Sequence, residues 1–290
     1  MKPWPENKMS AIRNPNLGPS QMRARRRRLF FVRSSIVLFF LFIMTISLAI
    51  FSGHEKVKIQ TIIVSGNAAV SSDEVLALVN RDMAGRYLYL FAKSNSLIFP
   101  RFQIKKDLLN EIKTINSVDI SWEDWQTISI SITERKPHSV WCGQDIKVLE
   151  QKCFFIDKGG YIYSDAPSFS GDIFIKNYGA TVLDLDDISN ISYIGNYFLP
   201  AATYQQIFSL IQILEQSSIK VVALSFDGYD YKFILKSGPE IIFNDKTDFA
   251  LSFGNLFTAI ETGNLDLVKD ANIINYIDLR FDNKIVVGKK

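Results

Sequence analysis

The sequence is poor in the residues and motifs that carry most enzyme chemistry. Its 290 residues include two Cys and two His. His54 lies far in the sequence from His138, Cys142 and Cys153, so we expect no four-ligand structural zinc site. The patterns G-x-S-x-G, H-E-x-x-H and G-x-x-x-x-G-K do not occur; they mark serine hydrolases, zinc proteases and P-loop proteins. We therefore expect no catalytic residues, no metal and no cofactor.

The sequence also lacks a basic main body. Residues 1–33 hold nine Lys and Arg against one Glu, a net charge of +8, which leaves −5 for residues 34–290. Binding of nucleic acid across a surface requires Lys and Arg that neutralise many phosphates. The charge distribution therefore predicts that nucleic acid is not a partner.

One stretch lacks ionisable residues altogether. Residues 34–53 read SSIVLFFLFIMTISLAIFSG, and as a helix at about 1.5 Å per residue they span about 30 Å, the thickness of the hydrocarbon core. A buried core helix and a cleaved signal peptide are the alternatives, but the apolar region of a signal peptide runs only about 7–15 residues. The length predicts an uncleaved transmembrane helix.

The charges around this helix predict its direction in the membrane. The residues before it include Arg23, Arg25, Arg26, Arg27 and Arg28. Such clusters stay in the cytoplasm and contact anionic lipids. We therefore expect a cytoplasmic basic tail over residues 1–33, flexible over its first twenty, and a single-pass protein whose remaining residues lie outside the cytoplasmic membrane.

An oxidising exterior also bears on the two cysteines. Outside the cytoplasmic membrane disulfides form and persist, so Cys142 and Cys153 are a candidate disulfide. Two buried thiols are the alternative reading.

Residues 57–136 show the pattern of a small α+β domain. VKIQTIIV ends at a Ser65-Gly66-Asn67 turn, and Ser71 and Glu74 have the spacing of a helix-capping box. A second helix follows from apolar residues at 104, 108, 112 and 115, and alternation around residues 118–122 and 128–132 predicts two half-buried strands. The predicted order is β-α-α-β-β.

Residues 137–287 predict an antiparallel sheet with two helices. Short strands HSVWC, KCFFI and YIYSD are followed by a helix at residues 207–214, three strands between residues 219 and 244, a helix at residues 249–260 and strands INYIDLRF and IVV. The predicted hairpin turn between KCFFI and YIYSD is DKGG. Asp184, Asp186 and Asp187 form either a cation-binding cluster or a solvated turn, and we expect the turn. The whole chain is predicted as α+β.

Three stretches, together with this order of elements, resemble a known family. They are IIVSGNAAVSSDEV (62–75), ISITERKPHSVW (130–141) and YIDLRFDNKIVV (276–287). They are similar to the POTRA domain and the following β-domain of the FtsQ/DivIB cell-division proteins, in which an E-R-x-P-x-A-x-W motif ends the first domain and D-L-R stands near the end of the second. Phe281 and Asn283 match the residues after D-L-R, whereas Lys284 replaces the usual Gly.

The resemblance implies a divisome scaffold in the cytoplasmic (inner) membrane, expected at the division septum. In that family the β-domain binds the bitopic FtsB and FtsL proteins by adding a strand to its open edge. Carried over residue by residue, the candidate contacts are Arg280, Phe281, Asn283, Ile285, Val286 and Val287. Core burial is the alternative role for Phe281. The alternative functions are a POTRA-containing transport or assembly factor and a membrane-anchored cell-wall enzyme.

Overall fold

The computed structural model describes residues 19–148, 152–169, 171–179, 181, 193–281 and 284–290. Three predictions fall outside this range in whole or in part: the first 18 residues of the tail, the turn at Asp184, Asp186 and Asp187, and the contact residue Asn283. Contacts divide the chain into two compact units. The first unit comprises described residues up to 61 together with 81–100 and 122–128, and the second comprises described residues in 62–80, 101–121 and 129–290.

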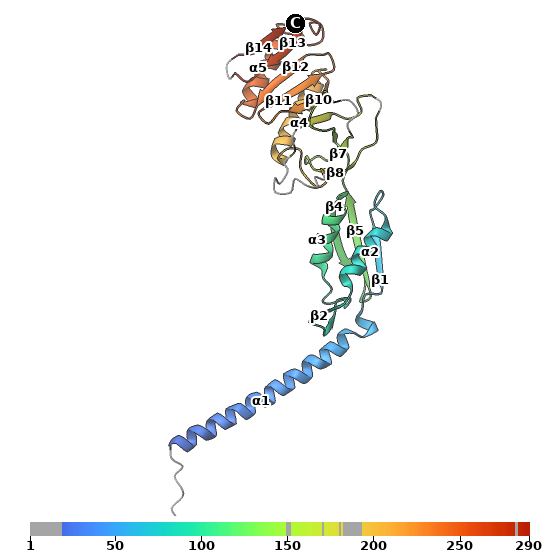
Figure 1. Ribbon diagram of the computed structural model, residues 1–290, viewed down its shortest axis with the longest axis vertical. Coiled ribbons are helices and arrows are strands. Elements are labelled where there is room, and N and C mark those ends of the chain that lie inside the picture. The colour runs from blue at the N-terminus through green and yellow to red at the C-terminus, as the bar shows by residue number, and fades with distance from the viewer. Residues whose placement is uncertain (1–18, 149–151, 170, 180, 182–192, 282–283) are drawn as a thin grey trace, which may run out of the picture. The chain divides into compact units, whose positions relative to one another are not determined.

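The first unit is dominated by a long helix, α1 (Pro19–Ser52) (Figure 1). Its part from Arg25 to Ser52 is long and apolar enough to cross a membrane, and none of its most apolar window is buried. Proline is favoured in the first helical turn, where its missing N–H costs nothing. The helix was predicted from residue 34, whereas α1 begins at Pro19, so residues 19–33 are helical and continue directly into the apolar segment.

Short elements complete the first unit. A 3₁₀ turn, η1 (Glu55–Val57), follows α1, and strands β2 (Arg86–Tyr87) and β3 (Phe91–Ala92) form a small hairpin. This hairpin was not predicted, since two-residue strands give no readable alternation.

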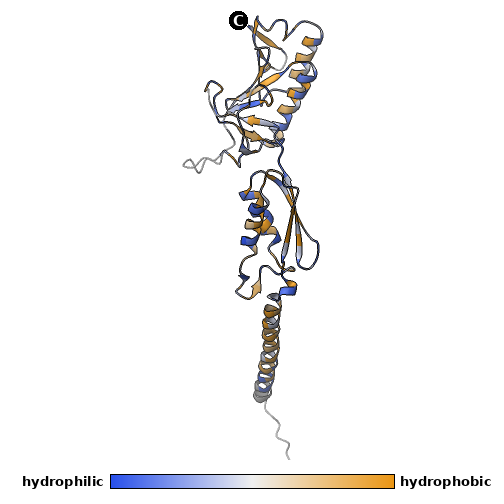
Figure 2. Ribbon diagram, turned by 90° about the vertical axis from the view of Figure 1, so that its right-hand side faces the viewer, coloured by the Kyte–Doolittle hydropathy of each residue, from blue (hydrophilic) through white to orange (hydrophobic). Residues whose placement is uncertain are grey.

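A three-stranded sheet of order β1-β5-β4 carries the predicted β-α-α-β-β elements. The strands and helices are β1 (Thr61–Ser65), α2 (Ser72–Met83), α3 (Arg101–Glu111), β4 (Ile115–Trp122) and β5 (Thr127–Glu134). Ser71 caps α2 through its hydroxyl oxygen, which accepts from the N–H of Asp73 at 3.2 Å. Figure 2 shows the helices on one side of the strands, and apolar side chains on both layers, such as Val75, Leu108 and Ile130, are buried between them.

The second unit also contains a nine-stranded sheet of order β14-β13-β12-β11-β10-β9-β6-β7-β8. Its strands are β6 (Ser139–Trp141), β7 (Phe154–Ile156), β8 (Ile162–Asp165), β9 (Lys176–Gly179), β10 (Val221–Phe226), β11 (Asp230–Leu235), β12 (Glu240–Asn244), β13 (Ile274–Asp278) and β14 (Val286–Lys289). Helices α4 (Ala201–Gln216) and α5 (Phe249–Glu261) contribute to its core. The described chain is thus mixed α/β with large sheets.

The prediction of a purely antiparallel sheet is wrong. Strands β10, β11 and β12 form the expected antiparallel meander, but β6–β9, β9–β10 and β12–β13 pair in parallel. Parallel neighbours need a crossover connection, and α4 and α5 provide two of them, between β9 and β10 and between β12 and β13.

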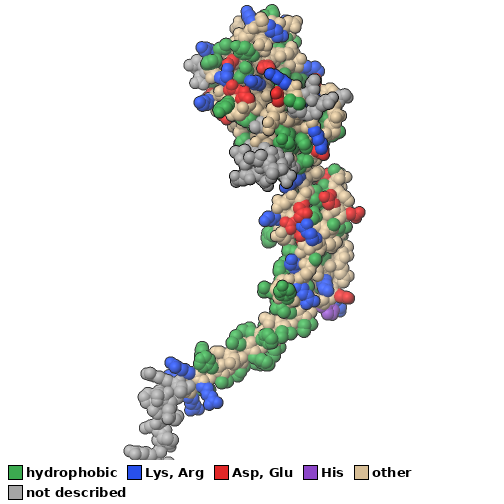
Figure 3. Space-filling view, in the orientation of Figure 1, with side chains coloured by type: hydrophobic (Ala, Val, Ile, Leu, Met, Phe, Trp, Pro, Cys, Tyr) green, Lys and Arg blue, Asp and Glu red, His purple; other side chains and the backbone are tan. Residues whose placement is uncertain are grey.

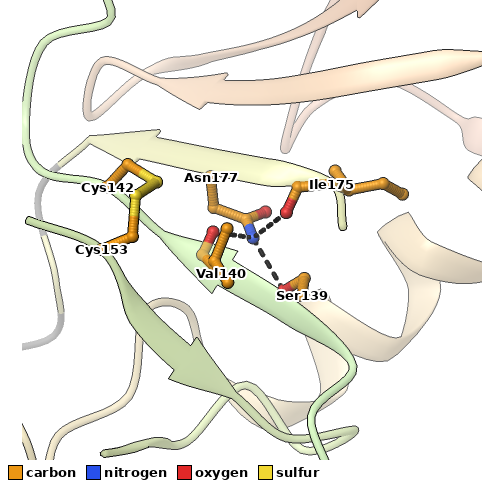
Figure 4. Close-up of a disulfide and its surroundings, with 6 residues drawn as sticks. All are labelled: Ser139, Val140, Cys142, Cys153, Ile175 and Asn177. Carbon is orange, nitrogen blue, oxygen red and sulfur yellow. Dashed lines mark hydrogen bonds between the residues drawn. A yellow bond between two sulfur atoms is a disulfide. The ribbon is translucent and has the colours of Figure 1, made fainter. Parts of the chain in front are cut away.

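Strand β9 lies in the middle of the sheet, although its sequence gave no sign of a strand. Its Asn177 is fully buried, and the side-chain Nδ2 donates to Ser139 Oγ at 2.8 Å and to the carbonyl of Val140 at 2.9 Å (Figure 4). These bonds join β9 to β6. Beside them Cys142 and Cys153 are linked in a disulfide (Figure 4).

Candidate functional site

The two ends of the nine-stranded sheet differ. At the β8 end, the segment around Asn196 covers the strand: the N–H of Ile162 donates to the carbonyl of Asn196 at 2.9 Å, and the N–H of Gly195 donates to the carbonyl of Ile162 at 2.8 Å. Tyr161 and Tyr197 form a further bridge there. The start of this edge, at Ile162, is therefore already paired with the protein's own chain.

The opposite end is β14, which pairs with β13 on one side and has no neighbouring strand on its other side among the described residues (Figure 1). The N–H of Lys290 donates to the carbonyl of Ile273 at 2.9 Å. Successive residues of a strand direct their backbone groups to alternate sides, so Gly288 and Val286 also face β13. The N–H and C=O groups of Val287 and Lys289 consequently point away from the sheet.

The side chain of Val287 ends a row of core residues. Val287 lies opposite Ile277, Ile277 lies beside Ile241, and Ile241 lies opposite Phe233. The inner three are fully buried, whereas Val287 is 37% exposed because no strand lies beyond it. The row is apolar up to the open edge.

The other face of the edge is covered by an aromatic ring. Tyr276 lies opposite Gly288, and a Cβ atom added to Gly288 would come within 2.3 Å of Cε1 of the tyrosine ring. The ring therefore occupies the space above the glycine. Only a residue without a side chain fits beneath it at this position.

The Arg280 side chain forms hydrogen-bonded ion pairs with two aspartates of the protein. Its Nε and Nη2 donate to the two carboxylate oxygens of Asp278 at 2.9 and 2.5 Å, and Nη1 donates to Asp230 Oδ2 at 2.7 Å. These bonds to the guanidinium hold the pKa of the buried Asp278 below its ordinary value, and the pKa of Arg280 is raised in turn. Arg280 thus ties the end of β13 to β11.

The other predicted contact residues are divided between the surface and the core. Phe281 is 44% exposed, and the ammonium of Lys284 lies 5.0 Å from the centre of its ring. Ile285 packs against the main core, and Val286 is half-buried in β14. The described candidates therefore lie just after β13, just before β14 and within β14, and their side chains range from exposed to core-packed.

Sequence reasoning missed three members of this edge. Tyr276 and Gly288 form the cross-strand pair, and Asp230 accepts from Arg280. A glycine directly after the run Ile285–Val287 was the available signal, because glycine within a strand often marks close approach of another group. The Asp230 contact links residues 50 positions apart and has no local signal.

The motif at residues 134–141 has a structural role elsewhere in the second unit. A carboxylate oxygen of Glu134 accepts from the N–H groups of Ala68, Ala69 and Val70 at 2.7, 3.0 and 2.9 Å. Burial acts to raise the pKa of Glu134, but these hydrogen bonds outweigh it and the pKa is lowered. Two stretches that carry the family resemblance therefore contact each other.

Within the described part of the chain, no group of three or more His, Cys, Asp and Glu residues is placed to hold a metal ion. Comparison of the chain with protein-family models and with curated proteins gives no match.

Proposed function

We propose that this protein is a cell-division scaffold of the FtsQ/DivIB kind, anchored by α1, whose β14 edge receives a strand from FtsB-like and FtsL-like bitopic partners. The observation that carries the proposal is the contrast between the two ends of the sheet. The β8 edge is paired with its own chain at its first residue, Ile162, and β14 presents the outward backbone groups of Val287 and Lys289. A scaffold of this kind needs a binding edge and no reacting groups.

The chemistry of the edge indicates what an incoming strand should carry. A residue placed opposite Val287 would extend the row of Phe233, Ile241 and Ile277, and side chains that face one another across strands lie about 4.5–5.5 Å apart. We therefore expect an apolar residue there. On the other face, the space is already occupied by the Tyr276 ring, so we expect small or polar neighbours.

A short edge can still bind a partner when both are held in one membrane. Strand β14 has four residues and includes the exposed Lys289, and short, charged edges resist indiscriminate pairing. Attachment of the scaffold and its partner to the same bilayer raises their effective concentration. Specific pairing then requires only the few main-chain bonds that Val287 and Lys289 can offer.

The proposed strand addition is tested by Val287→Pro. The N–H of Val287 faces away from β13, so its removal leaves the β13–β14 ladder intact, and proline is tolerated on an edge strand in that orientation. The incoming strand loses a donor and meets the proline ring. We expect folded Val287→Pro protein to lose at least about tenfold in affinity for the FtsB-like partner of its own cell, measured by titration of the full chain in detergent.

The matched control is Val287→Ala, which keeps the N–H and shortens the side chain. We expect it to retain most of the binding, and circular dichroism shows whether both variants are folded. Phe281→Lys examines the neighbouring exposed aromatic in the same assay. Folded Val287→Pro protein that binds as tightly as the wild type would exclude β14 as the docking edge.

The cellular part of the proposal has its own measurement. A fluorescent fusion to the N-terminus should form a ring at midcell, and the Val287→Pro fusion should fail to recruit the FtsB-like partner there. A uniform signal around the cell periphery would instead favour a transport or assembly factor.

A further inference from the structure

The turn between β2 and β3 is strained and apolar. Leu88 and Tyr89 both have positive φ, 48° and 62°, and the N–H of Leu90 donates to the carbonyl of Tyr87 at 2.9 Å to close the turn. Glycine and asparagine usually fill such positions, since other residues cost of order 1–3 kcal/mol each. Here they carry large apolar side chains, and Tyr89 is 94% exposed.

This turn belongs to a hairpin that is fixed to the last residue of α1. The hydroxyl oxygen of the buried Ser52 accepts from the N–H of Ala92 at 2.8 Å, and Nδ2 of the buried Asn95 donates to the Ser52 carbonyl at 3.1 Å. Figure 1 shows β2 beside the end of α1. The exposed apolar turn is therefore held where the apolar helix ends.

Two tryptophans, Trp122 and Trp125, lie in the same unit, in a segment that is hydrogen-bonded to residues near the end of α1. Trp122 Nε1 donates to the carbonyl of Ser96 at 3.0 Å, and Trp125 is 66% exposed. With Leu97 they line an apolar pocket of about 300 Å³. Nε2 of Gln126, the next residue, donates to the carbonyl of Glu55, three residues beyond α1, at 3.0 Å.

We propose that these side chains, Leu88, Tyr89, Leu90, Leu97, Trp122 and Trp125, form an exit surface that lies in the interfacial layer of the phospholipid bilayer beside α1. Tryptophan and tyrosine concentrate in this layer because their rings have an apolar body and a polar edge. Figure 3 shows hydrophobic side chains along α1 and near its end. In the bilayer, the strained turn exposes its side chains to lipid instead of water.

The near balance of charges around the exit surface favours apolar insertion over attraction to anionic lipid. The cations near the exit surface are Lys56, Lys58, Arg86 and Lys93, and the anions are Glu55, Glu123 and Asp124. Because the two signs nearly balance, we expect the contact to depend little on anionic lipid or on salt. The basic cluster Arg25–Arg28 in the first part of α1 differs in this respect.

The inference rests on the proposed function, in which α1 spans the membrane. The test distinguishes failure of the span from failure of the exit surface. Full-length Trp4→Tyr protein is reconstituted into phosphatidylcholine vesicles, either plain or brominated on the acyl chains near the headgroup. Flotation with the vesicles reports the span. Bromine quenching of tryptophan fluorescence reports the exit surface, since Trp141 is buried in the protein core and serves as the internal unquenched indole.

We expect the Trp4→Tyr protein to be quenched and the added Trp125→Ser change to reduce the quenching, with Trp122 of the exit surface accounting for the remainder. Trp125 is exposed, so this variant should fold. Tyr89→Trp in the Trp125→Ser background should restore quenching from another part of the exit surface.

Flotation without quenching, or quenching that Trp125→Ser leaves unchanged, would overturn the exit surface alone. Failure to float would overturn the span and the exit surface together. If soluble acrylamide still reaches Trp125 in vesicles, the exit surface faces water or a protein partner, and the inference is wrong.

Discussion

At the residue scale, Arg280 shows how a candidate contact can also support the fold that presents the site. Its guanidinium satisfies both carboxylate oxygens of the buried Asp278 and reaches Asp230. Bidentate pairs of this kind fix geometry as well as charge. The start of the segment that leads into β14 is therefore set by an ion pair.

Replacing Arg280 with Gln should destabilise the fold. The change leaves the Asp278 carboxylate without its main donor, and an unsatisfied buried acceptor costs about 1–3 kcal/mol. Arg280→Lys keeps the charge without the two-pronged geometry and should fall between the wild type and Gln. Urea unfolding of the three proteins at pH 7 measures the difference, and an unchanged midpoint for Gln would show that the pair contributes nothing.

The Asp278–Arg280 pair also predicts that the stability of the folded protein falls at acidic pH. The folded-state pKa of Asp278 is lowered mainly by the hydrogen bond from Arg280, so its stabilisation is present above the ordinary carboxyl pKa of about 3.9 and is lost as the pH falls below it. The Arg280→Gln protein lacks this contribution. Its stability should consequently change less steeply with pH in that acidic range.

At the element scale, β14 depends on a cross-strand fit between Tyr276 and Gly288. A valine at position 288 collides with the tyrosine ring, and overpacking costs typically about 1–3 kcal/mol. We expect Gly288→Val to weaken both the stability and the partner binding of the edge. In a Tyr276→Ala background the same change should cost much less, because the colliding ring is absent.

The double-variant cycle is measured by thermal unfolding and by the partner titration. Additive effects of the two changes would show that the ring does not lie over the glycine. Coupling in stability without coupling in binding would separate the fit of β14 from its use as a docking edge.

The elements that the sequence predicts are those with a repeated apolar pattern over many residues. Elements that depend on contacts distant in the sequence could not be predicted. The apolar stripe within residues 207–214 predicted α4, and the run at 249–260 predicted α5, whose N-terminus is capped by Asp248, accepting from the N–H of Leu251 at 3.1 Å. Strand β9 has no alternation, and it is placed by the bonds of the buried Asn177. Parallel pairing is likewise decided by the crossovers and has no local signature.

The candidate site was also predicted only in part. The position of the last strand was predicted from the run Ile285–Val287, and β14 begins within it at Val286. Which edge is open could not be predicted, because the closure of the β8 end depends on pairing between residues around 162 and 196.

At the scale of the whole molecule, Arg135 joins the predicted 57–136 and 137–287 regions. Its Nε donates to the carbonyl of Lys113 at 3.1 Å, Nη1 bonds the carboxylate of Asp157, and the guanidinium lies 4.1 Å from the centre of the Tyr161 ring. One side chain therefore contacts both regions.

Arg135→Gln should loosen this connection. We expect the two regions to unfold at more widely separated temperatures, since both ion pair and ring contact are lost. We also expect the chain to become easier to cleave after Lys158, which follows the ion-pair partner Asp157. Scanning calorimetry and limited trypsin digestion of the full chain test this. Lys136→Gln, an exposed neighbour, is the control for calorimetry, and a thermogram of Arg135→Gln identical to that control would contradict the expectation.

The bonds of Ser52 to Ala92 in β3 and to Asn95, three residues beyond β3, have a mechanical consequence. They join the last residue of α1 to a folded element at two atoms, the hydroxyl oxygen and the carbonyl oxygen. The helix therefore cannot rotate about its long axis without carrying the hairpin with it. Packing of α1 against a helix of another protein would accordingly determine which side of the hairpin is turned toward that protein.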